Sequence, residues 1–289
     1  MATRNSILRQ IFGDTFRSVP APRFRPEPAS WKDDAITGSC LGHSTVLLNF
    51  VGSWVLTDPV FSARVGPGRS PFILGPKRYL RPALGVGEFP VPELIVLSHA
   101  HFDHLDLSSL RKFSRDTVVV TAKGTSDLLR RFRQVHEIEW KQTIELSLPS
   151  GEVTVTAVEV NHWGARMLRD EHRGYNGYVL EKQGRRVFYT GDTAMTDAFS
   201  HLGANGRDID LVLMPIGAYN PWIRAHCNPE QAYVMANAAG AKTFVPVHHQ
   251  TFKLSAEPME EPGQRIRAAF AKEPERLLAV DVGETFVVP

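Results

Sequence analysis

The sequence contains the stretch Ser98-His99-Ala100-His101-Phe102-Asp103-His104, which places three histidines and one aspartate directly after the apolar run Leu94-Ile95-Val96-Leu97. Neutral imidazole nitrogens and carboxylate oxygens are ligands that suit zinc and similar divalent ions. The alternative is a polar loop in which each side chain is solvated or hydrogen-bonded. A buried polar group without a partner costs about 1–3 kcal/mol, however, and nothing nearby in the sequence satisfies four such groups. The stretch therefore predicts a metal site.

Further ligands are expected on loops that follow other strands, because one cluster of this size cannot complete two coordination spheres. His162 follows the alternating stretch 153–160, Asp192 follows 186–189 and His248 follows 243–247. Ligand sites are often built at strand ends, and all three residues are of metal-binding types. We therefore expect these side chains to join the cluster.

From residue 38 to residue 248 the sequence resembles the metallo-β-lactamase superfamily of hydrolases. The resemblance is carried by Asp58, the stretch 99–104, His162, Asp192 and His248, which occur in the family's order. It implies an α/β fold, the family's four-layer αβ/βα sandwich, in which two sheets face each other with helices outside. Many chemistries occur on this scaffold, so the motifs indicate fold and metal more strongly than substrate.

A narrower set of motifs is similar to the branch that contains N-acyl-phosphatidylethanolamine-hydrolysing phospholipase D and its bacterial relatives. The motifs are Leu41-Gly42-His43-Ser44-Thr45, Asp58-Pro59-Val60-Phe61-Ser62, Gly75-Pro76-Lys77-Arg78, Asn161-His162-Trp163, Pro215-Ile216-Gly217-Ala218-Tyr219, and His226 followed by Asn228-Pro229-Glu230. This resemblance implies a phosphodiesterase.

The resemblance also implies a dinuclear site with two divalent ions. The implied ligands are His99, His101 and His162 on one ion, Asp103, His104 and His248 on the other, and Asp192 bridging both. Zinc is the expected metal, with manganese and iron as alternatives, because carboxylate-rich sites accept several ions. A water that bridges two such ions ionises near neutral pH, and the resulting hydroxide is the expected nucleophile.

Catalytic roles are assigned to Asp58, Asp103 and His226. Asp58 is interpreted as a carboxylate that orients a ligand, since metal-bound histidines usually donate their other N–H to such a group; a turn aspartate before Pro59 is the alternative. His226 is expected to protonate a leaving group or to hold a phosphate oxygen. Asp103 acts through the second ion that it binds.

Four residues are candidates for substrate contact. His43 lies in a turn, where turn stabilisation is an equal alternative, and His249 follows His248, where a buried hydrogen-bonded role is an equal alternative. Tyr219 and Trp222 lie in a proline-containing loop and are expected to line a pocket. Trp163 is assigned to core packing, the commoner role of an aromatic residue.

Hydrophobic periodicity and turn residues predict five helices and a larger number of strands. Helices are expected at 107–114, 124–134, 194–203, 229–239 and 259–271, and strands at 36–40, 45–50, 53–57, 117–121, 136–140, 153–160, 176–181, 186–190, 210–214, 243–247 and 277–288. Residues 59–92 are rich in proline and glycine and predict a long loop. Its cations are expected to meet an anionic substrate over the metal cleft, with a plain surface connection as the equal alternative.

Composition limits the cellular context. A net charge of +2 from 33 basic and 31 acidic residues does not indicate a nucleic-acid partner. The two cysteines lack metal-binding or disulfide spacing, which favours the reducing cytoplasm, and no apolar run approaches a membrane span. Four prolines between residues 20 and 28 predict an extended arm over 1–34, followed by a single catalytic domain over 35–289. The basic, amphipathic start of the arm leaves peripheral membrane contact open, as composition leaves open a homo-oligomer.

The leading hypothesis is a dinuclear metal-dependent phosphodiesterase that hydrolyses a phospholipid-like or other small phosphodiester through a metal-bridging hydroxide. A lactonase or other carbonyl-ester or amide hydrolase on the same site is the alternative enzyme. A metal-binding regulatory protein is the non-enzymatic alternative, and the complete ligand set argues against it.

Overall fold

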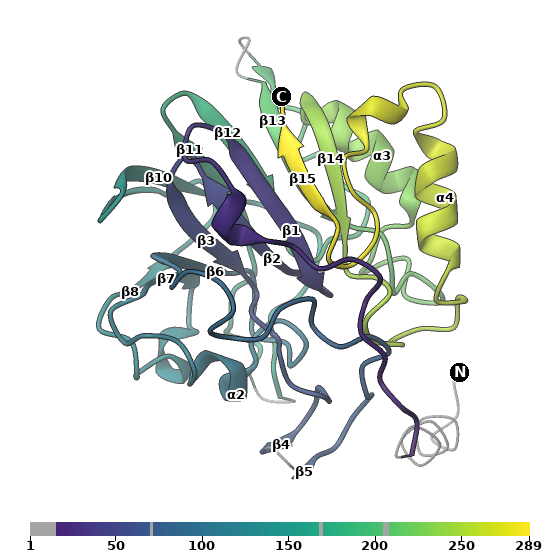
Figure 1. Cartoon of the computed structure of the whole chain (residues 1–289), viewed down its shortest axis with the longest axis horizontal. Coiled ribbons are helices and arrows are strands. Elements are labelled where there is room, and N and C mark those ends of the chain that lie inside the picture. Colours follow the sequence, from purple (N-terminus) through teal and green to yellow (C-terminus); the bar gives the residue numbers. More distant parts are fainter. Residues whose placement is uncertain (1–15, 70–71, 168–169, 205–207) are drawn as a thin grey trace.

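Two mixed β-sheets pack against each other and form the frame of the protein (Figure 1). The computed structural model describes residues 16–69, 72–167, 170–204 and 208–289. The seven-stranded sheet has the order β15 (Thr285–Val288), β1 (Ile36–Gly42), β2 (Thr45–Phe50), β3 (Ser53–Thr57), β6 (Leu94–Leu97), β7 (Val118–Ala122) and β8 (Val135–Ile138). The six-stranded sheet has the order β14 (Ala241–Val247), β13 (Ile209–Pro215), β12 (Arg185–Tyr189), β11 (Gly177–Lys182), β10 (Gly151–Val158) and β9 (Thr143–Leu148). A separate hairpin consists of β4 (Gly68–Arg69) and β5 (Phe72–Ile73).

Each sheet contains a parallel part whose strands end at a common edge. β3, β6, β7 and β8 are parallel neighbours in the first sheet, and β12, β13 and β14 are parallel neighbours in the second. Parallel strands are buried on both faces and read as continuous apolar runs, as in β6, whose four residues are all buried. The loops that follow these strands carry most of the candidate metal ligands.

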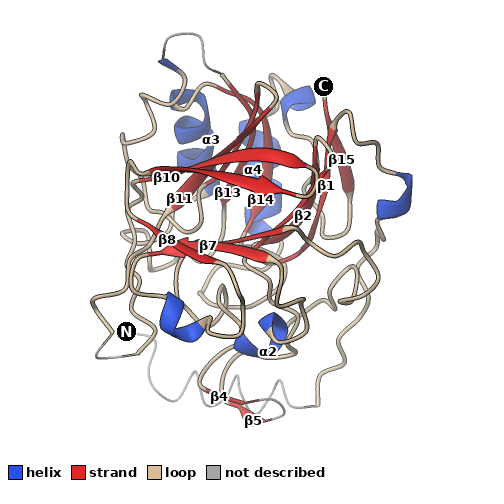
Figure 2. Cartoon of the chain, turned by 90° about the vertical axis from the view of Figure 1, so that its left-hand side faces the viewer, coloured by secondary structure: helices blue, strands red, loops and turns tan. Residues whose placement is uncertain are grey.

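Apolar side chains fill the space between the sheets and cover both outer faces. Figure 2 shows the strands of the two sheets in red and the helices outside them in blue. Within the described residues the helices are α2 (Leu107–Leu110), α3 (Pro229–Ala238) and α4 (Glu261–Ala269), with short 3-10 turns at Pro28–Ser30, Ser126–Leu128 and Pro274–Arg276. Val96 of the seven-stranded sheet and Leu213 of the six-stranded sheet belong to the same buried cluster. Met235 of α3 and Ile266 of α4 pack on the six-stranded sheet, and Leu110 of α2 packs on the seven-stranded sheet. The arrangement confirms the predicted α/β sandwich.

Three of the five predicted helices are wrong or much shorter than expected. The stretch 107–114 forms only the four residues of α2, and 124–134 forms only the turn Ser126–Leu128. The helical spacing there comes from Leu129 and Phe132, which pack from a loop onto the sheet. No helix forms over 194–203, because the loop is tied to the site through Ala194, whose N–H donates to Asn161 O. The helices at 229–239 and 259–271 are confirmed with slightly different ends.

The strand predictions are more accurate. Only the final prediction, 277–288, is too long, since its first half forms turns and the strand β15 covers only its end. The edge strand β9 was not predicted, and neither was the β4–β5 hairpin. In β9 polar residues alternate with Ile144, Leu146 and Leu148, which is the pattern of a half-buried strand, so the signal for β9 was present in the sequence.

The arm and the membrane question are only partly covered by the described residues. The apolar residues at the start of the arm, such as Ile7 and Phe12, lie outside them. Of the helices within the described ranges, none has the length and apolar composition that a bilayer crossing requires.

Candidate metal centre

The candidate ligands lie in loops from both sheets that meet at one edge. Ser98 to His104 follow β6, Asp192 follows β12 and His248 follows β14. The loops are tied together by backbone contacts, since Asn176 N–H donates to Ser98 O at 3.0 Å and His99 forms a β-bridge with Tyr175. The two sheets therefore bring their strand ends to the same place.

Three histidines form the first group of candidate ligands. His101 Nδ1 lies 2.7 Å from His99 Nε2 and 3.3 Å from His162 Nε2. The outer nitrogens are occupied: His162 Nδ1 donates to Ala225 O at 2.9 Å, and His99 Nδ1 lies 2.9 Å from Ser98 Oγ, which itself donates to a carboxylate. The inner nitrogens thus present lone pairs to one another, an arrangement that a shared cation stabilises.

The second group surrounds Asp103. Its Oδ2 lies 3.0 Å from His43 Nε2, 3.4 Å from His248 Nε2 and 3.7 Å from His104 Nε2. The His43 and His248 rings are 4.1 Å apart. This group contains the three residues assigned to the second ion, and it also brings in His43, which the sequence assigned to substrate contact.

Asp192 lies between the two groups. Its Oδ2 is 3.0 Å from His104 Nε2 and 3.2 Å from His248 Nε2 on one side, and 3.8 Å from His162 Nε2 on the other. The side chain is almost fully buried. Its position is the one expected of a bridging ligand.

Asp58 supports the cluster from behind. The carboxylate accepts hydrogen bonds from His104 Nδ1 at 2.6 Å, from Ser98 N at 2.8 Å and Ser98 Oγ at 2.5 Å, and from the Tyr189 hydroxyl. The bond to His104 fixes its tautomer, so that Nε2 faces Asp192. This contact agrees with the orienting role predicted for Asp58.

Several of these residues have a positive backbone φ, which residues other than glycine seldom adopt. φ is 57° at His43, 62° at His248 and 29° at Asp58. Such conformations cost on the order of 1–3 kcal/mol each and are concentrated at functional sites. The fold therefore stores strain at the cluster.

Burial keeps most of the imidazoles neutral. It lowers the pKa of His43 and of His162 to about 3 and that of His226 to about 4, and it holds the pKa of His99 well below its usual value. A neutral imidazole is the form that binds a metal ion. These rings are ready to act as ligands at neutral pH.

The carboxylates at the centre require positive charge beside them. Burial alone would raise the pKa of Asp192, but His104 and His248 hold it well below its usual range. Burial likewise opposes charge on His248, yet Asp192 and Asp103 raise its pKa to about 9. Protons or a divalent cation can supply this charge, and metal binding at such a site releases the protons.

Buried polar atoms without hydrogen bonds test whether a metal fits. They include Asp192 Oδ1, His104 Nε2, His248 Nε2 and His226 Nδ1. Candidate ligand atoms within each group lie within 4.8 Å of one another, and atoms that bind one zinc at about 2.2 Å lie up to about 4.4 Å apart. Coordination by the expected ligands would satisfy the atoms of Asp192, His104 and His248 and leave His226 Nδ1 free for a substrate, so the residues fit divalent metal binding.

The other predicted site residues differ in their relation to the cluster. His226 stacks on His248 at 5.2 Å, and its Nδ1 lies 3.7 Å from Asp192 Oδ2. Tyr219, by contrast, is buried and its hydroxyl donates to Glu261 of α4 at 2.6 Å, a contact that draws it toward the helix.

His249 and Trp222, two of the candidates for substrate contact, differ in exposure. Burial lowers the pKa of His249 to about 4. The charge of Asp281 opposes this shift, whereas His248 and Arg267 add to it. Trp222 is half exposed in the turn that leads to His226. Substrate contact by either residue stays a prediction.

Trp163 is the aromatic residue that the sequence assigned wrongly. It is not in the core: 46% of its surface is exposed, and its ring lies 4.8 Å from the His101 ring and 4.3 Å from the His162 ring. Its position directly after His162 was the available signal.

The cations of the 59–92 loop mostly hold the loop itself. Arg64 Nη1 donates to Gly75 O at 2.8 Å, and Lys77 Nζ donates to Arg17 O at 2.5 Å. Arg78 is buried beside Gly42, and its guanidinium has no hydrogen-bond partner within the described part of the chain. For Arg64 and Lys77 these contacts favour a role in shaping the loop over one in meeting substrate.

Comparisons with known proteins agree with this geometry. Residues 53–249 match the model of the beta-lactamase superfamily domain. The chain is 34% identical over 271 residues to an uncharacterized protein of Mycobacterium tuberculosis, a match that covers 90% of this chain and 70% of that protein. It is 26% identical over 272 residues to N-acyl-phosphatidylethanolamine-hydrolyzing phospholipase D 1 of Caenorhabditis elegans, covering 87% of this chain and 76% of the relative.

A solved structure supports the fold. A metallo hydrolase from the hyperthermophilic archaeon Ignicoccus hospitalis superposes with a TM-score of 0.64 at 18% sequence identity, covering 88% of this chain and 99% of that chain. At this identity the likeness concerns the architecture alone.

Proposed function

The chain belongs to the metallo-β-lactamase superfamily and is a metal-dependent hydrolase, and from this premise we propose that it hydrolyses a phospholipid-like or other small phosphodiester at a dinuclear centre. The observation that carries the proposal is the pair of ligand groups that share Asp192, in a chain similar to a phospholipase D. We propose zinc for both ions, with manganese or iron as substitutes.

The proposed ligands follow the two groups. His99, His101 and His162 would hold one ion, Asp103, His104 and His248 the other, and Asp192 both. Bound there, the ions would act as Lewis acids and lower the pKa of water to near 7. His43 is close enough to Asp103 to orient it or to join the second group.

The remaining residues would position the groups that react. Asp58 fixes the His104 tautomer, so that Nε2 stays directed at the centre. His226, beside Asp192 and His248, would hold a phosphate oxygen or give a proton to the leaving alkoxide. Trp163 offers a half-exposed apolar face beside His101 for the organic part of a substrate.

Turnover of the zinc- and manganese-loaded protein on bis(p-nitrophenyl) phosphate, a lactone and a β-lactam tests the proposal. We expect phosphodiester cleavage that disappears in Asp192→Ala and persists in Asp197→Ala, an exposed aspartate on the same loop. Hydrolysis of the carbonyl substrates alone would overturn the assignment of substrate class.

Membrane contact by the N-terminal arm is a separate proposal. It rests on the basic amphipathic sequence of the arm and on similarity to a lipid-hydrolysing relative. Failure of the full-length protein to bind anionic vesicles at low salt would contradict it.

A further inference from the structure

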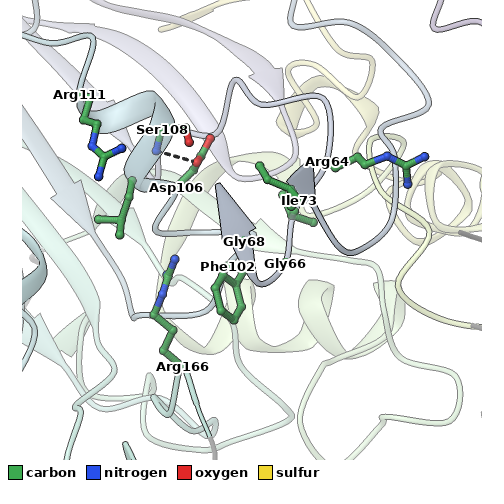
Figure 3. Close-up of a pocket in the computed structure, with 11 residues that line it drawn as sticks. Arg64, Gly66, Gly68, Ile73, Phe102, Asp106, Ser108, Arg111 and Arg166 are labelled. Carbon is green, nitrogen blue, oxygen red and sulfur yellow. Dashed lines mark hydrogen bonds between the residues drawn. The ribbon is translucent and has the colours of Figure 1, made fainter. Parts of the chain in front are cut away.

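A basic cavity of about 110 Å³ lies beside the β4–β5 hairpin (Figure 3). Its walls come from the β4–β5 hairpin, from α2 and the residue before it, and from Phe102 and Arg166. None of the candidate metal ligands lines it. A single water needs about 10–15 Å³ of such volume, so the cavity has room for a polyatomic group.

Arg166 connects this cavity to the ligand loop. Its Nη1 donates to Ala100 O and to Leu105 O, both at 2.8 Å, so that one guanidinium joins the two ends of the stretch that carries the metal ligands. The guanidinium also lies 4.0 Å from the centre of the Phe102 ring. Burial lowers the pKa of Arg166 to about 10, which leaves it cationic at neutral pH.

The only carboxylate in the lining is already satisfied. Asp106 accepts from Ser62 Oγ at 2.5 Å, from Ser109 Oγ at 2.5 Å and from Ser108 N at 3.0 Å. Ser62 lies in the loop after β3, and Ser108 and Ser109 lie in α2, so these bonds hold Asp106 in the wall of the cavity. Within the described residues Asp106 forms no ion pair with the lining arginines, although its charge opposes the effect of burial on the pKa of Arg166.

Positive charge in the cavity therefore exceeds negative charge. The Arg111 side chain has no hydrogen-bond or ion-pair partner in the described ranges, and both Arg111 and Arg166 line the cavity (Figure 3). Arg64 completes the lining, but its guanidinium turns away and is held by Gly75 O. A guanidinium offers a rigid fork of N–H donors that suits phosphate oxygens, so two arginines in one lining favour such an anion.

We propose that this cavity binds a phosphate-type anion, separate from the group that is hydrolysed at the metal centre. Arg111 and Arg166 supply the charge, and Arg166 passes the effect of binding to the ligand loop through Ala100 and Leu105. The anion is either a soluble phosphate or a lipid headgroup. The hairpin beside the cavity carries Phe72, which is 84% exposed, so a lipid surface is one source to be tested.

Two measurements on the metal-loaded protein locate the site. A crystal soaked in tungstate, a phosphate analogue, is expected to show anomalous density between Arg111 and Arg166, and phosphate titration calorimetry is expected to show a site that Arg111→Gln weakens about tenfold or more. The Arg111 side chain is exposed and forms no hydrogen bond or ion pair within the described residues, so this variant is expected to fold. Arg130→Gln, at an exposed arginine outside the cavity, is the matched control.

The outcomes separate this site from the metal centre. Tungstate at the metals only, or equal phosphate titrations for Arg111→Gln and the control, would overturn the proposal, whatever the hydrolytic assay shows. Phosphatidylcholine vesicles with and without phosphatidylglycerol then identify the source. Arg111-dependent binding to the anionic vesicles indicates a lipid headgroup, and binding of free phosphate without binding of vesicles indicates a soluble ligand.

Discussion

The two sheets contribute to the metal centre in different ways. The seven-stranded sheet supplies a dense run of ligands from the single loop 99–104, whereas the six-stranded sheet supplies one residue at the end of each of three strands, His162, Asp192 and His248. A short loop sets the positions of its own ligands. Ligands on separate strands depend on strand register and on contacts between the sheets, so the second half of the centre is the half that the whole fold must position.

The largest effect is expected at Asp192, which lies between the two groups of ligands. Asp192→Asn removes the carboxylate charge that both groups face, so we expect loss of bound metal and a fall in turnover of about a thousandfold or more. Metal content by mass spectrometry and turnover of the loaded variant measure it. An Asp192→Asn protein with full metal content and full activity would show that the two groups do not share this ligand.

The second-largest effect is expected at Asp58, which supports His104 in the loop 99–104. Asp58→Asn preserves shape but weakens the charge-assisted bond to His104 Nδ1, and loss of such a partner typically costs about 10- to 100-fold in metal affinity or activity. Competition with a zinc chelator gives the affinity. Unchanged affinity would mean that Asp58 is a turn residue whose contact with His104 is incidental.

The sequence pattern predicted the ligands of the loop 99–104 more directly than those that follow the strands of the six-stranded sheet. The spacing of His99, His101 and His104 in one loop already predicted a metal site. Asp192 and His248, by contrast, are single polar residues after strands: their position at strand ends made them candidates, and the family's order of motifs assigned each of them to an ion. Their convergence results from the packing of two sheets, which no local pattern encodes.

His43 and Trp163 show what the sequence could not predict. His43 joins Asp103 because a turn with a left-handed backbone, closed by the bond from His248 N–H to His43 O, directs it inward. Trp163 contacts the rings of His101 and His162 while nearly half of its surface stays exposed, a placement that its own sequence position does not determine. The missed helices have the same origin, since apolar residues such as Leu129 and Phe132 have helical spacing but belong to loops that pack on a sheet. In each case tertiary contacts decide the outcome.

A smaller effect is expected at the contact between the two sheets. Gly191 has φ of 60°, and a Cβ there would lie 2.5 Å from Ser98 Cβ, so Gly191→Ala would push the Asp192 loop away from the ligand loop. Gly184→Ala is the matched control, because its φ is also positive, at 77°, but nothing lies within 4 Å. We expect thermal unfolding to show that Gly191→Ala loses about 1–3 kcal/mol more stability than the control. Equal losses would show that backbone strain alone is involved and that the sheets can separate slightly without cost.

The smallest effect is expected at two exposed tryptophans near the metal centre, Trp163 and Trp222. Trp163 lies against His101 of one half and His162 of the other, while Trp222 has no ring contact with either in the described structure. An aromatic contact contributes about 0.5–1.5 kcal/mol, so Trp163→Leu should raise KM about 2- to 10-fold with little change in kcat. Trp222→Leu should change neither constant if substrate lies over the metal-binding histidines. The reverse pattern, with Trp222→Leu raising KM and Trp163→Leu silent, would move the substrate toward the turn before His226 and would support the contact first predicted for Trp222.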